Sequence, residues 1–273
     1  MWSAFGRRAP HFMRACVFAL AASLCASISQ AAPVRAASLN LCTDELVLLI
    51  AAPPQIASVT HLARNRHESP LWRTARRFPA NDGSIVSVAG MRPDVIVTMG
   101  GMARDQEQLA GRIGARLISL DYPQSLDDIA AGTMEIARAL DRESRGRRIV
   151  RALRRLQRST PSESREGAFL SGGGLTHYEG SLGAAWLALA GLVPPEGLGA
   201  QISAERILTN PPPIIVRSNY RQDQASRDNH WIGYRFLERA SATRTIRTDG
   251  RLWTCAGPLL IAEVARLRRE IWR

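Results

Sequence analysis

Residues 36–50, AASLNLCTDELVLLI, join a short apolar run to a leucine-rich amphipathic segment through a turn that holds Cys42. The run over 37–41 is β-like, and the pattern over 44–51 is helical. A similar arrangement returns near the other end in DGRLWTCAGPLLIAEVARL, residues 249–267, where Cys255 precedes a second helical pattern. Each cysteine therefore stands at a turn that leads into a helix.

Outward from this stretch, short apolar runs alternate with helical patterns up to residue 141. Ser125 followed by Asp128 resembles a capping box and predicts where the last of these helices begins. Strands separated by helices favour a parallel sheet with right-handed crossovers. We expect strands over 37–41, 55–60, 95–99 and 116–120, and helices over 44–51, 104–114 and 126–140, in an N-terminal α/β lobe of residues 32–141.

The pattern changes in RESRGRRIVRALRRLQRS, residues 142–159, where apolar side chains share one helical face and arginines cover the other. A helix of this length is roughly 27 Å long. The arginine run is more simply a solvated helix face than a binding patch. The polar segment STPSESREG follows it as a boundary. A C-terminal α/β lobe of residues 160–273 then has expected strands over 167–170, 213–217 and 243–247, and expected helices over 181–190 and 258–272. The predicted fold class is α/β: two Rossmann-like lobes with parallel sheets, joined by one long backbone helix.

The N-terminus has the pattern of a secretory signal peptide over residues 1–31. Arg7, Arg8 and Arg14 precede an apolar run over 15–28 and a small-residue cleavage region. Cleavage removes these three arginines and no acid, so the formal net charge falls from +12 to about +9. Every basic residue other than histidine is arginine, and an exported chain seldom meets DNA, so we expect no nucleic-acid partner. The choice between the general and the twin-arginine export route stays open.

Four motifs carry a family resemblance: SLNLCTDEL, MRPDVIVTMG (91–100), ISAERILTNPPPIIV (202–216) and RLWTCAGP (251–258). Together they resemble the periplasmic receptors for vitamin B12 and ferric siderophores. The resemblance implies a monomeric binding protein, not an enzyme, in the periplasm. It also implies that the protein captures a small metal-chelate ligand between two lobes and delivers it to an inner-membrane ABC permease dimer with ATPase subunits. No intrinsic cofactor is implied, although the ligand could carry cobalt or iron.

Ligands of open α/β sheets bind beyond the carboxyl ends of the strands, so residues at those turns are the candidates for ligand contact. Aromatic walls and a few arginine anchors would suit a large planar ligand. The candidate cleft residues are Asn40, Cys42, Thr43, His61, Arg64, Tyr178, Tyr220, Arg221, Trp253 and Cys255.

In this family each lobe docks on the permease through a glutamate. Glu205 matches the position in the second lobe, whereas Val86 occupies the matching position in the first. Asp82 is a nearby acid that could act instead, and Pro213 replaces the usual acidic residue before a second-lobe strand. The way in which the first lobe docks is therefore open.

The two cysteines that remain after cleavage leave three alternatives. An oxidising compartment favours a Cys42–Cys255 disulfide, which would link the lobes across the cleft and oppose opening. Two thiols facing the ligand could instead coordinate a metal centre such as haem iron or cobalt. Unrelated buried thiols are the third alternative.

Other chemistry fits the sequence less well. Haem or another tetrapyrrole is the main rival ligand. A bare-metal receptor is a further alternative, although only His61, His67, His177 and His230 remain after cleavage and no structural zinc spacing occurs. We predict no metal site. A secreted hydrolase on a two-lobed scaffold is the alternative of another class. It fits the sequence poorly, because no acid and base pair has a distinctive spacing.

Overall fold

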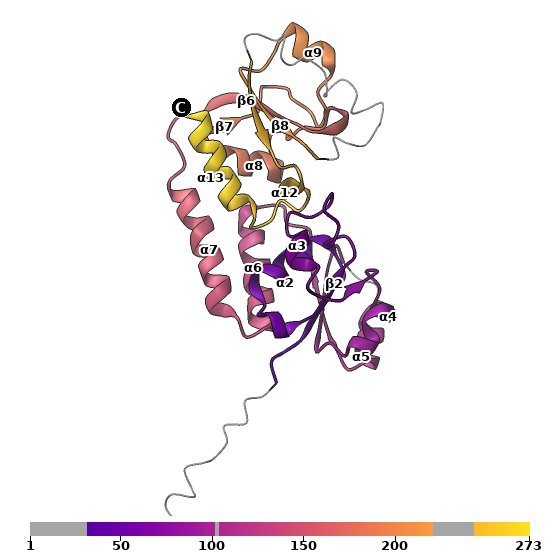
Figure 1. Ribbon diagram of the computed structural model, residues 1–273. Coiled ribbons are helices and arrows are strands. Elements are labelled where there is room, and N and C mark those ends of the chain that lie inside the picture. The colour runs from indigo at the N-terminus through magenta and orange to yellow at the C-terminus, as the bar shows by residue number, and fades with distance from the viewer. Residues whose placement is uncertain (1–31, 102–103, 221–242) are drawn as a thin grey trace, which may run out of the picture. The chain divides into compact units, whose positions relative to one another are not determined.

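Two separate, entirely parallel β-sheets organise the chain (Figure 1). The computed structural model describes residues 32–101, 104–220 and 243–273, and residues 33–273 form one unit. Each sheet is the centre of one lobe, and helices lie on its faces. The predicted fold class is thereby confirmed.

The first sheet has the strand order β3-β2-β1-β4-β5. The burial of all five residues of β2 explains why its sequence reads as a continuous small and apolar run, as parallel strands covered on both faces do. The strands are β1 (Ala36–Ser38), β2 (Ile56–Thr60), β3 (Ala80–Asn81), β4 (Val95–Met99) and β5 (Arg116–Leu120). The helices of this lobe are α2 (Leu41–Ile50), η2 (Pro53–Gln55), α3 (Trp72–Ala75), α4 (Ile85–Val88), η3 (Ala89–Met91) and α5 (Arg104–Arg112).

The second sheet has the order β7-β6-β8-β9 and repeats the same principle with four strands. Its core is built around the fully buried Trp186, whose indole N–H donates to the Ala256 carbonyl over 2.8 Å. The strands are β6 (Arg165–Leu170), β7 (Leu192–Val193), β8 (Ile214–Ser218) and β9 (Arg244–Thr248). The helices are η4 (Gly172–Gly174), α8 (Leu182–Ala188), α9 (Ala204–Thr209), α12 (Arg251–Thr254) and α13 (Leu260–Ile271).

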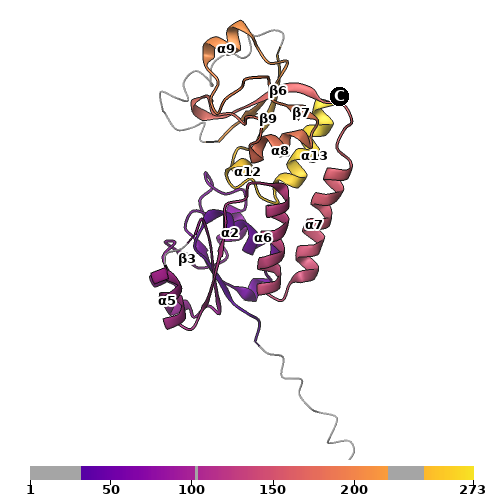
Figure 2. The ribbon, with the colours of Figure 1, turned by 180° about the vertical axis from the view of Figure 1, so that it is seen from behind.

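Two packed helices connect the lobes, α6 (Leu126–Ala139) and α7 (Glu143–Arg158) (Figures 1 and 2). On α6, Ile129 belongs to the core of the second lobe and Ile136 to that of the first. The predicted backbone helix is α7, which also packs against α13 of the second lobe. The connection is therefore stiffer than a single helix, because α6 is anchored in both cores.

The sequence-based boundaries agree closely with the structure where the pattern is long. The strands over 95–99 and 116–120 are confirmed, and the capping box at Ser125 and Asp128 begins α6 as predicted. The strand expected over 37–41 was too long, because Asn40 caps a helix that already begins at Leu41. Six short elements, α3, α4, α9, α12, β3 and β7, were not predicted, since each holds too few residues to show a period. No helix in the described part of the chain is long and apolar enough to cross a membrane.

Candidate functional site

The strand order reverses beside the central strands of both sheets. In the first sheet β2 and β4 flank β1, and in the second β7 and β8 flank β6. Loops after neighbouring strands then run in opposite directions and leave a crevice at the carboxyl edge, where ligands of such sheets bind. The candidate site is therefore expected at the turns after β1, β4 and β5, and after β6, β8 and β9.

A pocket of about 380 Å³ lies at this edge of the first sheet and is closed on one side by the second lobe. We call it the interlobe pocket. Its size is at the lower end of the range of ligand pockets, about 300–1,000 Å³. It is lined by Cys42, Leu46, Met99, Leu120, Asp121, Tyr122, Pro123, Gln124, Asp128, Ile129, Ala131, Gly132 and Glu135 of the first lobe and α6, and by Cys255, Gly257 and Pro258 of the second.

The interlobe pocket combines apolar walls with an acidic rim. Asp121, Asp128 and Glu135 line it, and none of the described residues that line it is basic. Asp128 accepts hydrogen bonds from the backbone N–H groups of Gln124 and Ser125, both over 2.9 Å, and these bonds hold the pKa of its carboxyl below the usual value. The rim is thus anionic in a chain whose net charge is strongly positive.

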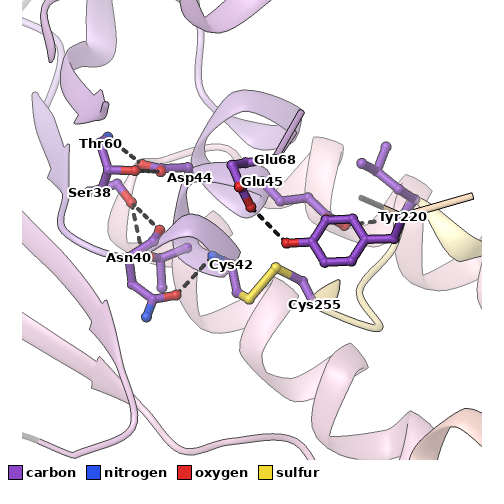
Figure 3. Close-up of a disulfide and its surroundings, with 11 residues drawn as sticks. Ser38, Asn40, Cys42, Asp44, Glu45, Thr60, Glu68, Tyr220 and Cys255 are labelled. Atoms are coloured by element: carbon purple, nitrogen blue, oxygen red, sulfur yellow. Dashed lines mark hydrogen bonds between the residues drawn. A yellow bond between two sulfur atoms is a disulfide. The ribbon is translucent and has the colours of Figure 1, made fainter. Parts of the chain in front are cut away.

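Cys42 and Cys255 form a disulfide in the wall of this pocket, so the structure contains the first of the three alternatives for the cysteines (Figure 3). Their Cα atoms are 5.2 Å apart. Cys42 lies in the first turn of α2, where the Asn40 side chain accepts a hydrogen bond from its backbone N–H over 2.8 Å. Asn40 is therefore occupied in capping the helix that carries the cysteine.

Glu45 lies one turn further along α2 and is almost completely buried, with 7% of its surface exposed. Its Oε1 accepts a hydrogen bond from the backbone N–H of Leu259, in the second lobe, over 3.1 Å. Burial raises the pKa of this carboxyl to about 7, and the hydrogen bond offsets only part of the effect. Burial likewise raises the pKa of its neighbour Asp44 to about 6, although Asp44 accepts two hydrogen bonds from Thr60.

His61 and Arg64 lie together in a different place, a hollow of about 470 Å³ after β2. We call it the basic hollow, because its charged and titratable lining residues are all arginine or histidine. The lining residues are His61, Arg64, Asn65, Arg66, His67, Arg76 and Ala80. This arrangement could accept a carboxylate or phosphate group from a ligand.

The loop after β2 also joins the lobes through hydrogen bonds. The Tyr220 hydroxyl donates to Glu68 over 2.7 Å (Figure 3). Arg251, held by an ion pair with Asp249, donates to the carbonyl of Arg66 over 2.6 Å. Tyr220 is thus placed at the junction of the lobes, as expected, but its hydroxyl bonds to protein.

Two candidate cleft residues are corrected by their burial. Thr43 is fully buried and bonded to Ser38 over 2.8 Å, so it offers no surface to a ligand. Trp253 is only 7% exposed; its ring packs against Phe169 at 4.8 Å between centroids, and its indole N–H donates to Thr248. Both side chains belong to the interior of their lobes, because each faces the sheet and not the cleft.

His177 completes the aromatic cluster around Trp253, with 5.4 Å between the two ring centroids. Burial lowers the pKa of this histidine to about 4, so the ring is neutral at neutral pH. Among the described residues, no group of three or more His, Cys, Asp and Glu side chains could hold a metal ion.

The remaining predicted residues are spread over the surface. Tyr178 is 47% exposed in the loop after β6. Glu205 is exposed in the first turn of α9, and Val86 is exposed on α4. Asp82 stands just before α4, where hydrogen bonds from Ser84 lower the pKa of its carboxyl to about 2. Arg221 lies outside the described residues.

The sequence analysis missed several pocket residues. Asp121 and Tyr122 directly follow β5, so the rule that pointed to the other strand ends could have found them. Gly257, which also lines the pocket, carried no such signal, and neither did Glu45 beside it, because only the packing of α2 on the second lobe brings these two residues together.

Two α/β lobes with parallel sheets, a helical connection and a pocket at the carboxyl edge define a two-lobed ligand-binding protein. The sequence matches the family model described as periplasmic binding protein over residues 37–246. The chain therefore belongs to the periplasmic binding protein family.

Solved structures show the same fold at low sequence identity. The periplasmic haem-binding protein HutB of Vibrio cholerae is 15% identical, with a TM-score of 0.68 over 88% of this chain and 99% of that one. The haem-binding protein BhuT, in complex with two haems, is 16% identical, with a TM-score of 0.61 over 86% and 96%. CeuE of Helicobacter pylori, with Ni(II) bound, is 13% identical, with a TM-score of 0.60 over 88% and 83%. No curated protein matches the chain.

Proposed function

We propose that this protein is a periplasmic receptor that captures a corrinoid or ferric-siderophore type of metal chelate between its lobes and delivers it to an ABC importer. The observation that carries the proposal is the interlobe pocket, which lies at the carboxyl ends of β4 and β5 and is lined from both lobes. In this proposal the chain catalyses no reaction, acts as a monomer and holds no cofactor of its own, and cobalt or iron belongs to the cargo.

The shape of the pocket favours part of a bulky ligand. About 380 Å³ with apolar walls suits one edge of a macrocycle or chelate, and in this proposal the rest of the ligand extends out of the pocket. The basic hollow would then receive anionic groups of the ligand, and Tyr178 would offer an exposed aromatic face.

Haem is the second candidate cargo. The observation that favours it is the likeness in fold to HutB and BhuT, which are haem-binding proteins. An exposed tyrosine beside the pocket, Tyr122, is compatible with a ligand that carries iron.

Docking on the permease is proposed to use an acid from each lobe. Glu205 on α9 serves the second lobe, and Asp82 takes the place that Val86 leaves without a charge in the first. Acids at both positions would pair with arginines of a permease dimer.

The test is a titration of residues 32–273 with cyanocobalamin, a ferric siderophore and haemin, followed by visible absorbance and native mass spectrometry. Binding of one of them should be lost in Gly132→Phe, which fills the pocket from α6, and kept in Gly199→Phe, which stands in open space. Absence of binding to all three would overturn the assignment of the cargo. Catalytic turnover without a retained ligand would favour a secreted hydrolase instead.

A further inference from the structure

The disulfide joins two segments that belong to different lobes. Cys42 stands in the first turn of α2, and Cys255 stands 213 residues later, between α12 and α13. Among the described residues it is the only covalent link between the lobes besides the chain itself. As long as the disulfide is intact, α2 of the first lobe and the segment between α12 and α13 of the second lobe cannot move apart.

Noncovalent contacts surround the disulfide on the same face of α2. Glu45 is three residues after Cys42 and accepts the backbone N–H of Leu259, which is four residues after Cys255. Between them the backbone of Gly257 approaches so closely that a Cβ atom there would lie 2.6 Å from Glu45 Oε1. The first turns of α2 and the segment over 255–259 therefore form one docked surface.

A second docked surface lies beside it. The loop after β2 meets the second lobe through the Tyr220–Glu68 hydrogen bond and the bond from Arg251 to the Arg66 carbonyl. The first of these hydrogen bonds is partly buried and the second is exposed, so water can compete for the groups that form them. Without the disulfide, such contacts hold a junction that can open and close.

Both sulfur-bearing residues also line the interlobe pocket and are partly exposed. A thiolate that enters the pocket can therefore reach the disulfide without unfolding either lobe. The cysteines are thus placed where a change in their redox state alters both the pocket wall and the junction between the lobes.

We propose that the Cys42–Cys255 disulfide is a redox-controlled clasp, a site for reduction by dithiols that releases the lobes from each other. A dithiol reductant attacks one cysteine sulfur as a thiolate, which forms a mixed disulfide with that cysteine and releases the other cysteine as a thiolate. The second thiol of the reductant then attacks its own sulfur in the mixed disulfide and releases the first cysteine. Two electrons and two protons pass to the protein, which gains the Cys42 and Cys255 thiols, and the reductant becomes a disulfide. This goes beyond the proposed function, because it holds whatever the cargo is.

The experiment measures the distance between the lobes in ligand-free protein, so its outcome is independent of the cargo. Val86 on α4 and Leu208 on α9 are 72% and 60% exposed and lie in different lobes. A Val86→Cys/Leu208→Cys variant of residues 32–273 is labelled with a maleimide donor and acceptor, which react with free thiols and leave the disulfide intact. Single-molecule energy transfer is then recorded before and after dithiothreitol.

We expect one narrow transfer distribution in the oxidised protein and a broader one, shifted to lower efficiency, after reduction. The matched control carries Cys42→Ser and Cys255→Ser in addition, and should show the broad distribution with or without dithiothreitol. Alkylation and mass spectrometry should find two new thiols in the reduced chain, and circular dichroism should show that both lobes stay folded.

Three results would overturn the proposal. The first is the same narrow distribution in the oxidised, reduced and double-serine proteins. The second is a disulfide that dithiothreitol reduces only in denaturant. The third is loss of the folded signal on reduction and in the double-serine protein, which would make the bond a plain stabiliser of the fold.

Discussion

The buried Glu45 of the first lobe accepts a hydrogen bond from the backbone N–H of Leu259 of the second lobe, over 3.1 Å. The carboxyl thus joins the lobes beside the disulfide, and burial raises its pKa from 4.5 to about 7. A raised pKa in the folded state means that the protonated form is the one the fold prefers. This stabilisation is complete below pH 4.5 and is lost as the pH rises toward 7.

The first prediction concerns Glu45→Gln, which keeps the acceptor oxygen and removes the charge. Unfolding by urea between pH 4.5 and pH 8 should show wild-type stability falling by about 3 kcal/mol more than that of the variant, because a shift of this size corresponds to that energy. The raised pKa of Asp44 contributes to both proteins and cancels in the difference. Equal pH profiles for both proteins would show that Glu45 does not ionise in a buried site.

The second prediction concerns Gly257. A Cβ atom there would lie 2.6 Å from Oε1 of Glu45, and the Glu45 side chain cannot turn away freely because it is buried and bonded to the backbone N–H of Leu259. Gly257→Ala should therefore lower the free energy of unfolding by about 1–3 kcal/mol. Gly199→Ala is the control, since a Cβ at that position meets nothing within 4 Å.

A double-mutant cycle with Gly257→Ala and Glu45→Ala tests whether the close approach of Gly257 to Glu45 causes this loss of stability. Truncating Glu45 removes the atom that the new methyl group would meet. The double variant should therefore lose less free energy of unfolding than the two single variants lose in sum. Additive effects would mean that the close approach of Gly257 is not what makes the alanine unfavourable.

The third prediction concerns the packing of α6 on α7. A Cβ at Gly146 of α7 would lie 2.5 Å from the Ala137 Cβ of α6, which is closer than two methyl groups can approach. Gly146→Ala should lower the melting temperature, although alanine favours a helix by about 1 kcal/mol over glycine. Gly132→Ala on α6, where the nearest atom is 3.5 Å away, should instead raise it. A stabilised Gly146→Ala protein would show that the two helices can move apart at little cost.

The sequence predicts those features of the structure that depend on neighbouring residues, and it does not predict those that depend on tertiary packing. The strand over 95–99 was predicted from a short apolar run between helical patterns, and the arginine-faced helix α7 from its periodicity, because both signals are local in the sequence. The position of Cys42 at a turn was also local, but its bond to Cys255 depends on how two lobes meet across 213 residues. Glu45 looks like an ordinary charged residue of a helix, and only tertiary packing buries it.

Trp253 is the opposite case: it was predicted to face the ligand, and tertiary packing places it in the interior. The rule that ligands bind beyond the carboxyl ends of parallel strands placed it beside the ligand, because it stands in the turn after β9. The chain direction at such a turn does not reveal which way a large side chain points. In the structure the ring faces the interior of the second lobe, where it joins Phe169 and His177.

The fourth prediction follows from this corrected position of Trp253. Trp253→Ala should lower the free energy of unfolding by about 3–5 kcal/mol, because it leaves a cavity beside two aromatic rings and removes one of the hydrogen-bond partners of Thr248. Trp253→Phe should cost less, since it keeps most of the apolar contact and loses only the 2.9 Å hydrogen bond from the indole. Urea unfolding measures the stability of both variants. Titration of the folded Trp253→Phe protein with haemin or cyanocobalamin measures ligand binding. If Trp253→Phe abolished binding while the stability stayed at the wild-type value, the ring would have to face the ligand after all.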